Sequence, residues 1–417
     1  MKRHQAVLSF LCSALIPISS FAAEEPAKKD QPGLIRRSLR HFLRDDETEG
    51  GGRGVHFGPL APRVVILSSG GGPGPALHLW APNLGNSPLD IHASAAYSIY
   101  KYQYYDLQFG LVPHVGERLP RIETGTNALF PLSDLEKTAA APGFNVYASA
   151  RYRDYPREDF YGVGPDSRKA DHADYRLQDG LYEGVLRFRV SRLSLMGRAG
   201  ILRTSILPGQ DPLDPNVETA FAEATAPGLL HAPDFNHFSA GGWLELRDEP
   251  GNPHRGASFG VAYSHFDDRK GDAYKFDRLT MDAREYIRLG SNRNVVALRQ
   301  TASLDAVAPG RAAPFYLRST LGGGSLLRGY PSFRFRDDRL LYLASEYRFE
   351  AHPKVELALL YEAGKVFPEG SGFDFRGLRY GYGAGVRLKS RRRVHLRLDV
   401  LHGQEGTRVH LKLGPVF

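Results

Sequence analysis

The sequence predicts an all-β fold, a 16-stranded antiparallel transmembrane β-barrel, from three observations. First, segments of about ten residues alternate apolar and polar side chains over about 350 residues. Second, the polar positions hold charged residues and glycines in segment after segment, which distinguishes a barrel lumen from the wet face of a soluble sandwich. Third, beyond the N-terminal segment no run of about 18 apolar residues occurs, which excludes a transmembrane helix there.

Composition agrees with this fold class. Charged residues make up 24% and hydrophobic residues 42%, values that fit neither a disordered chain nor a helical membrane bundle. The 45 glycines, 21 tyrosines and 23 phenylalanines, against 2 tryptophans, are typical of a strand-rich protein. The single cysteine, Cys12, lies in a segment that we expect to be removed. The mature chain then has no disulfide and no cysteine-ligated metal site.

Residues 1–22 are predicted to be a secretory signal peptide. Lys2 and Arg3 precede a short apolar stretch, and small residues stand before a cleavage point after Ala22. We therefore expect Sec-type export. Residues 23–60 form a basic periplasmic tail, for which two interpretations stay open. The segment around 34–44 is either a short amphipathic helix that touches anionic lipid or plugs a pore, or a solvated tail, which we favour.

The strands of the barrel, residues 61–417, are predicted from apolar and polar side chains that alternate with a period of two residues. In 394–400 the even positions are apolar and the odd positions polar; in 378–388 the odd positions are glycine or arginine. The predicted segments are 63–69, 89–100, 103–115, 144–154, 173–189, 191–204, 236–247, 255–265, 275–290, 294–306, 314–322, 339–349, 354–364, 378–389, 393–402 and 407–417. The first and eleventh have the least regular alternation, and Pro73, Pro75 and Gly70–Gly74 interrupt residues 63–82.

The C-terminus carries an insertion signal. Val409, Leu411 and Leu413 occupy alternate positions of the last predicted strand, and Phe417 ends the chain. An aromatic C-terminus on an amphipathic last strand resembles the signal by which outer-membrane proteins are recognised for insertion. The sequence thus predicts contact with the outer-membrane assembly machinery during biogenesis.

Several motifs carry a family resemblance. They are Leu327-Arg328-Gly329-Tyr330, the strand containing Glu346-Tyr347-Arg348, Leu360-Tyr361-Glu362-Ala363-Gly364-Lys365-Val366-Phe367, and Tyr380-Gly381-Tyr382-Gly383-Ala384-Gly385-Val386-Arg387. In this order and spacing they resemble the outer-membrane assembly-factor barrels, the BamA/TamA-like family also called bacterial surface antigens. The resemblance implies a barrel in the outer membrane of a Gram-negative bacterium. It also implies contact with outer-membrane lipids, including lipopolysaccharide.

The resemblance predicts a long sixth loop that folds into the barrel. Gly322–Gly324 and Gly329 allow a sharp turn around Arg328, and alternation places Glu346 and Glu362 on the lumenal face. In the family, the matching arginine sits against acids on these two strands. We therefore expect Arg328 to pair with Glu362, which stands where the family usually has Asp, and with Glu346 as second partner. We call Arg328, Gly329, Tyr330, Glu346 and Glu362 the loop lock.

One departure from the family affects function. Members that assemble or secrete proteins carry periplasmic polypeptide-transport domains before the barrel, and about 37 residues after Ala23 leave no room for one. The sequence predicts a barrel-only, non-enzymatic member that assists insertion or translocation of a protein or lipid substrate. The alternative is a passive structural barrel or narrow pore. A short first strand weakly paired with the last would favour the former, as a gating seam.

Other classes of function find little support. No Gly-x-Ser-x-Gly elbow or other catalytic constellation marks an outer-membrane lipase or deacylase, and no cofactor or metal site is expected. The acidic pairs Asp267-Asp268 and Asp337-Asp338 fit solvated turns better than Ca²⁺ ligands. The lumenal arginines either make the lumen basic or pair with lumenal acids, which we favour. Positive charge inside a barrel does not indicate nucleic-acid binding.

Overall fold

The computed structural model describes residues 59–67, 70–113, 131–138, 143–271, 273–291, 293–372, 374–390 and 393–413. The chain divides into two units, Met1–Phe42 and Leu43–Phe417, and every described residue belongs to the second. The predicted signal peptide, nearly all of the predicted tail and Phe417 lie outside the described residues. No helix among those residues is long and apolar enough to cross a membrane.

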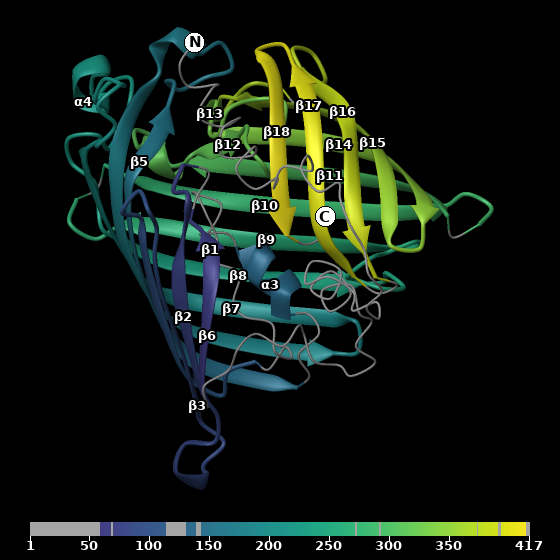
Figure 1. The fold of residues 1–417 in the computed structure, drawn as a ribbon. Helices are drawn as coiled ribbons and strands as arrows, with labels where there is room; N and C mark the ends of the chain where they lie inside the picture. The colour runs from purple at the N-terminus through teal and green to yellow at the C-terminus, as the bar shows by residue number, and fades with distance from the viewer. Residues whose placement is uncertain are drawn as a thin grey trace, which may run out of the picture. The chain divides into compact units, whose positions relative to one another are not determined.

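The second unit is built on one 16-stranded sheet in which each strand pairs antiparallel with its neighbours along the chain. Figure 1 shows that the sheet is strongly curved, with helix α3 (Pro131–Thr138) against its concave side. The strands of this sheet are β1 Leu60–Ile66, β2 Pro73–Ala81, β3 Asp90–Tyr97, β4 Gln103–Gly110, β5 Phe144–Phe160, β6 Ala173–Val190, β7 Leu193–Pro208, β8 Phe235–Glu245, β9 Gly256–Asp268, β10 Lys275–Arg288, β11 Asn294–Val307, β14 Arg339–His352, β15 Val355–Phe367, β16 Arg379–Lys389, β17 Val394–Gly403 and β18 Gly406–Leu413.

The predicted fold class and the number of 16 strands are confirmed. The number agrees because one predicted strand is missing from the large sheet and one strand that was not predicted is present. The predicted eleventh strand at 314–322 is not part of the large sheet. It contains the turn η4 (Phe315–Leu317) and β12 (Ser319–Leu321), which pairs only with β13 (Phe335–Asp337) inside the connection from β11 to β14. Conversely, the interrupted region contains the strand β2, which the alternation pattern did not reveal.

Strand β2 forms despite its prolines because of where they stand. Pro73 and Pro75 pair with β1, whereas the ladder to β3 begins only at Ala76, so their missing N–H groups do not interrupt that ladder. Gly74 is required between them, since a Cβ atom there would lie 2.0 Å from the carbonyl oxygen of Tyr97. Pro73, Gly74 and Pro75, which obscured the alternation pattern in the sequence, are therefore compatible with a strand near the edge of the sheet.

Alternation along the strands separates two faces of the sheet. On β17, Leu398 and Val400 are 42% and 40% exposed, whereas Arg397 and Asp399 are buried on the opposite face. The apolar positions meet across strands, as in the pairs Leu398–Leu411 and Val400–Val409. A continuous apolar outer face and a charged inner face are the arrangement that a lipid-embedded barrel requires.

The connections differ between the two ends of the sheet. Short turns join β6 to β7 and β14 to β15, whereas the connections β7–β8 and β11–β14 at the other end are long. The largest apolar cluster lies at the long-loop end. It joins strand ends such as Phe160 and Phe235 to η4 and to the helix α4 (Val217–Ala220). The β11–β14 connection is therefore held by packing as well as by its polar contacts.

Candidate functional site: a buried charge network around Arg328

The β11–β14 connection, residues 308–338, turns sharply to place its tip on the inner face of the sheet. Gly322 and Gly323 have φ angles of 110° and 96°, and Leu327 has a φ of 56°. A Cβ atom on Gly322 would lie 2.1 Å from the carbonyl oxygen of Pro331, so this turn needs glycine. Gly329 lies directly against Gly403 of β17, where a Cβ atom would lie 3.0 Å from the Gly403 nitrogen. The inward-folded loop predicted from the sequence is present.

Arg328 makes the predicted contact with Glu362. Its Nε donates to Glu362 Oε1 at 2.7 Å, and its backbone N–H donates to Glu362 Oε2 at 2.6 Å. Glu346, the predicted second partner, is more distant, with 3.8 Å between Arg328 Nη2 and Glu346 Oε1. The side chains of Arg328 and Glu362 are 1% and 0% exposed. Such a charge is tolerated in the interior only when it is fully paired.

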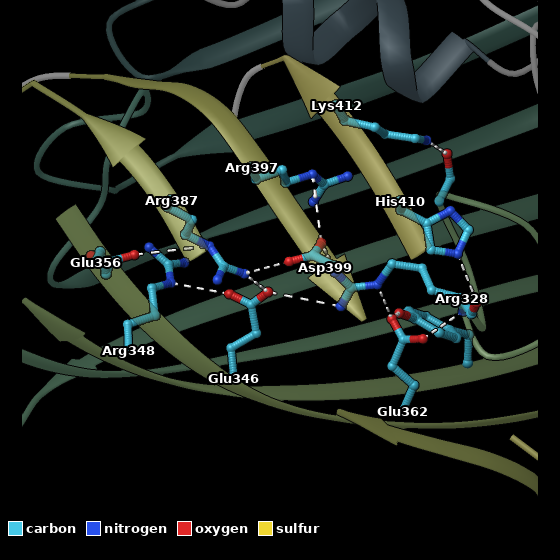
Figure 2. A network of polar contacts seen from close by, with 12 residues as sticks. Arg328, Glu346, Arg348, Glu356, Glu362, Arg387, Arg397, Asp399, His410 and Lys412 are labelled. Atoms are coloured by element: carbon cyan, nitrogen blue, oxygen red, sulfur yellow. Dashed lines mark hydrogen bonds and ion pairs between the residues drawn. The ribbon is translucent and has the colours of Figure 1, made fainter. Parts of the chain in front are cut away.

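Asp399 is a principal partner that sequence reasoning missed. Arg328 Nη1 donates to Asp399 Oδ2 at 2.7 Å, so the arginine joins β15 to β17 (Figure 2). Two further groups complete its surroundings. The Tyr342 hydroxyl donates to Glu362 Oε1 at 2.6 Å, and His410 Nε2 lies 2.8 Å from the Arg328 carbonyl oxygen. The loop tip therefore contacts β14, β15, β17 and β18.

A wider network surrounds this contact. Glu346 interacts with Arg387 at 2.7 Å and with Arg348 at 3.2 Å, and these ion pairs are drawn in Figure 2. We define the lumenal charge network as the buried ionic residues linked in this way, Arg328, Glu346, Arg348, Glu356, Glu362, Arg387, Arg397 and Asp399. Its arginines and carboxylates are equal in number, and the adjacent Lys389, which lies 3.7 Å from Glu356, is matched by Glu350 at 2.6 Å, so the formal charges cancel. In this part of the lumen the arginines pair with acids rather than create a basic channel.

Tyr330 fixes the other side of the loop tip. It is buried, and its hydroxyl lies 3.3 Å from the carbonyl oxygen of Tyr380 and 3.1 Å from Gln404 Oε1. Arg334, further along the loop, pairs with Glu405 in the β17–β18 turn at 2.8 Å. All five loop-lock residues therefore meet at one place on β14–β18.

The predicted insertion signal is only partly within the described residues. Val409 and Leu411 are 62% and 57% exposed on the outer face of β18. Leu413 pairs in register with Leu396, and Phe417 lies outside the described residues. The role of these four residues in insertion stays a prediction.

The acidic pairs singled out in the sequence have basic partners. Arg318 lies 3.5 Å from Asp337 and 3.2 Å from Asp338, and Asp267 lies 3.0 Å from Lys275. Among the described residues, no group of three or more His, Cys, Asp or Glu side chains is arranged to hold a metal ion.

The loop hairpin should become less stable as the pH rises through Asp337's pKa. Burial, together with Asp338 and Asp305, raises the pKa of Asp337 to about 6, although Arg318 and the Asp338 N–H oppose this. An unfolded aspartate titrates near about 3.9, so the folded form retains its proton more strongly. The resulting stabilisation is complete below about pH 4 and is lost as the pH rises through about 6, by roughly 2 kcal/mol.

We expect Asp337→Asn to remove this contribution to the pH dependence. The measurement is the unfolding free energy of the detergent-solubilised protein at pH 4.5 and pH 7.5, in wild type and variant. The stability of the variant relative to wild type should be greater at pH 7.5 than at pH 4.5. An equal difference at both pH values would contradict the assignment.

Comparisons with known proteins address the family. A family model described as the Omp85 superfamily domain matches residues 133–400. BamA from Haemophilus ducreyi lacking POTRA domains 1–3 is similar in structure, with a TM-score of 0.57 at 13% identity, covering 91% of this chain and 80% of that one. CdiB from Acinetobacter baumannii gives a TM-score of 0.47 at 11% identity, covering 91% of this chain and 68% of that one. CdiB from Escherichia coli gives 0.46 at 14% identity, with 91% and 67% covered.

No curated protein matches the sequence. The likeness to BamA supports the barrel fold predicted from alternation, and the family match supports the resemblance drawn from the loop and strand motifs. The matched residues comprise more than half of the chain and include the whole lumenal charge network. The chain belongs to the Omp85 superfamily of outer-membrane β-barrels.

Proposed function

We propose that this protein assists the insertion or translocation of a protein or lipid substrate at the outer membrane, through a seam between β1 and β18. The observation that carries the proposal is that the two edge strands of the sheet are not paired with each other in the described part of the chain. The sheet order ends at β1 and at β18, and within the described part of the chain no ladder joins them. Strand β1, with 7 residues, is the shortest in the large sheet, and β18 has 8 residues, as β3 and β4 do.

An unpaired strand edge is unfavourable in a bilayer. Each unsatisfied N–H or C=O group in hydrocarbon costs several kcal/mol, so the edges of β1 and β18 must pair with each other or with another strand. A weakly held pair can open and offer both edges to an incoming strand. The lumenal charge network supports this arrangement, because its ion pairs join β14, β15, β16 and β17 into one unit beside β18.

The proposed partners follow from this role. They are outer-membrane lipids, including lipopolysaccharide, around the apolar outer face, the assembly machinery during biogenesis, and a substrate at the seam. We propose a non-enzymatic role and Sec-type export. The alternative, a passive barrel or narrow pore, is favoured by one observation, the charge-balanced network on the inner face of β14–β17.

The two functions are separated by tethering the seam. Cys12 is the only native cysteine, so engineered pairs are unambiguous once it is replaced or removed. A panel that combines Val64→Cys on β1 with Val409→Cys or Leu411→Cys on β18 should form a disulfide in liposomes. We expect the reduced protein to accelerate insertion of an unfolded outer-membrane β-barrel substrate, and the oxidised protein to lose this activity.

The matched control tethers two strands far from the seam. Tyr105 and Tyr152 are directly opposite on β4 and β5, and both are exposed, so Tyr105→Cys with Tyr152→Cys should cross-link without effect. If the reduced wild type does not accelerate insertion, the passive barrel is the correct description. Equal activity of the oxidised and reduced seam variants would show that insertion does not require the β1–β18 seam to open and takes place at another part of the protein.

A further inference from the structure

Helix α3 is a second segment folded against the inner face of the sheet, from the end opposite to the Arg328 loop. It belongs to the connection between β4 and β5 and lies beside β7, β8, β9 and β10 (Figure 1). Its sequence is PLSDLEKT. At 8 residues it is shorter than the length at which an isolated helix is stable in water, so its helical form depends on the wall beneath it.

The apolar side of α3 fits a prepared surface. Leu132 and Leu135, one helical turn apart, are buried in a cluster with Trp243, Met196 and Ala262. Gly260 of β9 makes room for this contact, because a Cβ atom there would lie 2.9 Å from Leu132 Cδ2 and 2.5 Å from the Trp243 ring. The wall is therefore shaped to accept a leucine at this position.

The acidic side of α3 meets arginines on the wall. Glu136 Oε2 accepts from Arg284 Nη2 at 2.9 Å, and Glu136 Oε1 lies 3.4 Å from Arg247 Nη2. Asp134 pairs with Arg198 of β7, and Arg187 of β6 donates to the carbonyl oxygen of Thr138. Two carboxylates of one short helix thus contact three buried guanidinium groups.

These arginines have other partners on the sheet itself. Asp282 lies 2.6 Å from Arg284, Glu245 lies 2.5 Å from Arg247, and Glu183 lies 3.6 Å from Arg198. The Arg284 guanidinium also stands 5.1 Å from the centre of the Trp243 ring. Each guanidinium is therefore held in place by the sheet and presents its remaining donors to the helix. We expect such a preorganised site to keep its geometry when its occupant leaves.

We propose that this wall, Arg198, Trp243, Arg247, Gly260 and Arg284, is a binding site for an acidic, leucine-bearing peptide segment, and that α3 is its resident, displaceable occupant. A segment of this chemistry from another polypeptide would compete with α3. Displacement would open the lumen from the end opposite to the loop lock. The inference does not depend on the β1–β18 seam, because the site lies on β7–β10.

The first test measures ion conductance in planar bilayers. Wild type should show low conductance. The variant Asp134→Asn/Glu136→Gln leaves the sheet's own ion pairs intact and should raise the open probability at least about tenfold, since buried charge pairs are lost. The matched control is Glu218→Gln on α4, in a long connection at the other end, which should leave conductance unchanged. Heat-modifiable migration on gels verifies that each barrel has formed.

The second test supplies the occupant in trans. A synthetic peptide of residues 131–138 with blocked ends should close the Asp134→Asn/Glu136→Gln channel. The same peptide with Asn and Gln at the two acidic positions should not. Inorganic phosphate at equal concentration distinguishes a peptide site from a general anion site, and equal block by phosphate would overturn the proposal.

A third measurement uses the wild-type helix and is independent of channel activity. Leu135→Cys, with Cys12 replaced by Ser, places the only thiol at a fully buried position. Excess acidic peptide should accelerate its reaction with a soluble maleimide several-fold, and the neutral peptide should not. No acceleration, together with no change in conductance for the Asp134→Asn/Glu136→Gln variant, would mean that α3 is a fixed structural element and would exclude the proposal.

Discussion

Replacing Arg328 with alanine will lower the unfolding free energy of the folded barrel by about 3–5 kcal/mol, the largest effect that we expect from a single substitution. Arg328 is 1% exposed and lies between Glu362 and Asp399, each at 2.7 Å. Removing it strands Glu362, leaves Asp399 with only the more distant Arg387 and Arg397 at 3.7 and 3.8 Å, and takes from Glu346 one of its positive neighbours. The desolvation cost of the stranded charges, rather than the loss of one attraction, makes the effect large.

Removing the carboxylate partner instead, in Glu362→Ala, should lower the unfolding free energy by less. In Glu362→Ala, Arg328 keeps Asp399 at 2.7 Å and Glu346 at 3.8 Å, so its charge stays compensated. The double variant should be less destabilised than the sum of the two single variants, because the second substitution removes the charge that the first one strands. Arg328→Lys should be intermediate, since an ammonium group cannot serve Glu362 and Asp399 as a planar fork does.

The measurement is a double-mutant cycle on denaturant unfolding in detergent. The matched control is the exposed pair Arg168–Asp171, separated by 2.8 Å, whose cycle should give no more than about 1 kcal/mol. Strict additivity of Arg328→Ala and Glu362→Ala would show that the contact contributes no coupling. A loss for Arg328→Ala equal to that for Arg168→Ala would contradict the buried site itself.

The face on which each strand residue lies was predictable, because successive side chains of a strand point to opposite faces and apolar and polar residues therefore alternate in the sequence. This alternation placed Glu346 and Glu362 on the inner face, and the Leu-Arg-Gly-Tyr motif supplied the loop that meets them. Asp399 lies at an odd, polar position of 394–400 and was visible by the same rule. It was missed because alternation gives the face of a residue but not how far a loop tip reaches along the strands.

Strand β2 and helix α3 mark the limits of the pattern. Prolines such as Pro73 and Pro75 normally indicate a break in an interior strand. Here they precede the ladder between β2 and β3, which begins at Ala76, and the sequence alone does not show where that ladder begins. Helix α3 has only two turns, so its leucines and acids produce too short a pattern to distinguish from a polar connection. Its ionic partners on β7, on β10 and in the connection between β8 and β9 are distant in sequence and come together only once the sheet is formed.

Replacing Leu411 with aspartate will both destabilise the barrel and reduce its assembly in cells. Leu411 is exposed on the outer face and pairs with Leu398, whose side chain faces the same way. It lies five residues from Gly406, where β18 begins, which at about 3.4 Å per residue on a tilted strand places it near mid-depth of the bilayer. A carboxylate there costs about 2 kcal/mol, somewhat less than a lysine or arginine.

Depth and recognition can be separated with two further variants. Thr407→Asp puts the same charge on the same face of β18 near its outer end, where the cost should fall to about 0–1 kcal/mol. Deletion of Phe417 should lower assembly in cells but leave the unfolding free energy of refolded protein unchanged, because its predicted role is recognition rather than packing. Unfolding in lipid vesicles and the folded fraction in outer membranes are the two readouts. If Leu411→Asp matches Thr407→Asp in both, β18 does not present this face to lipid at mid-depth.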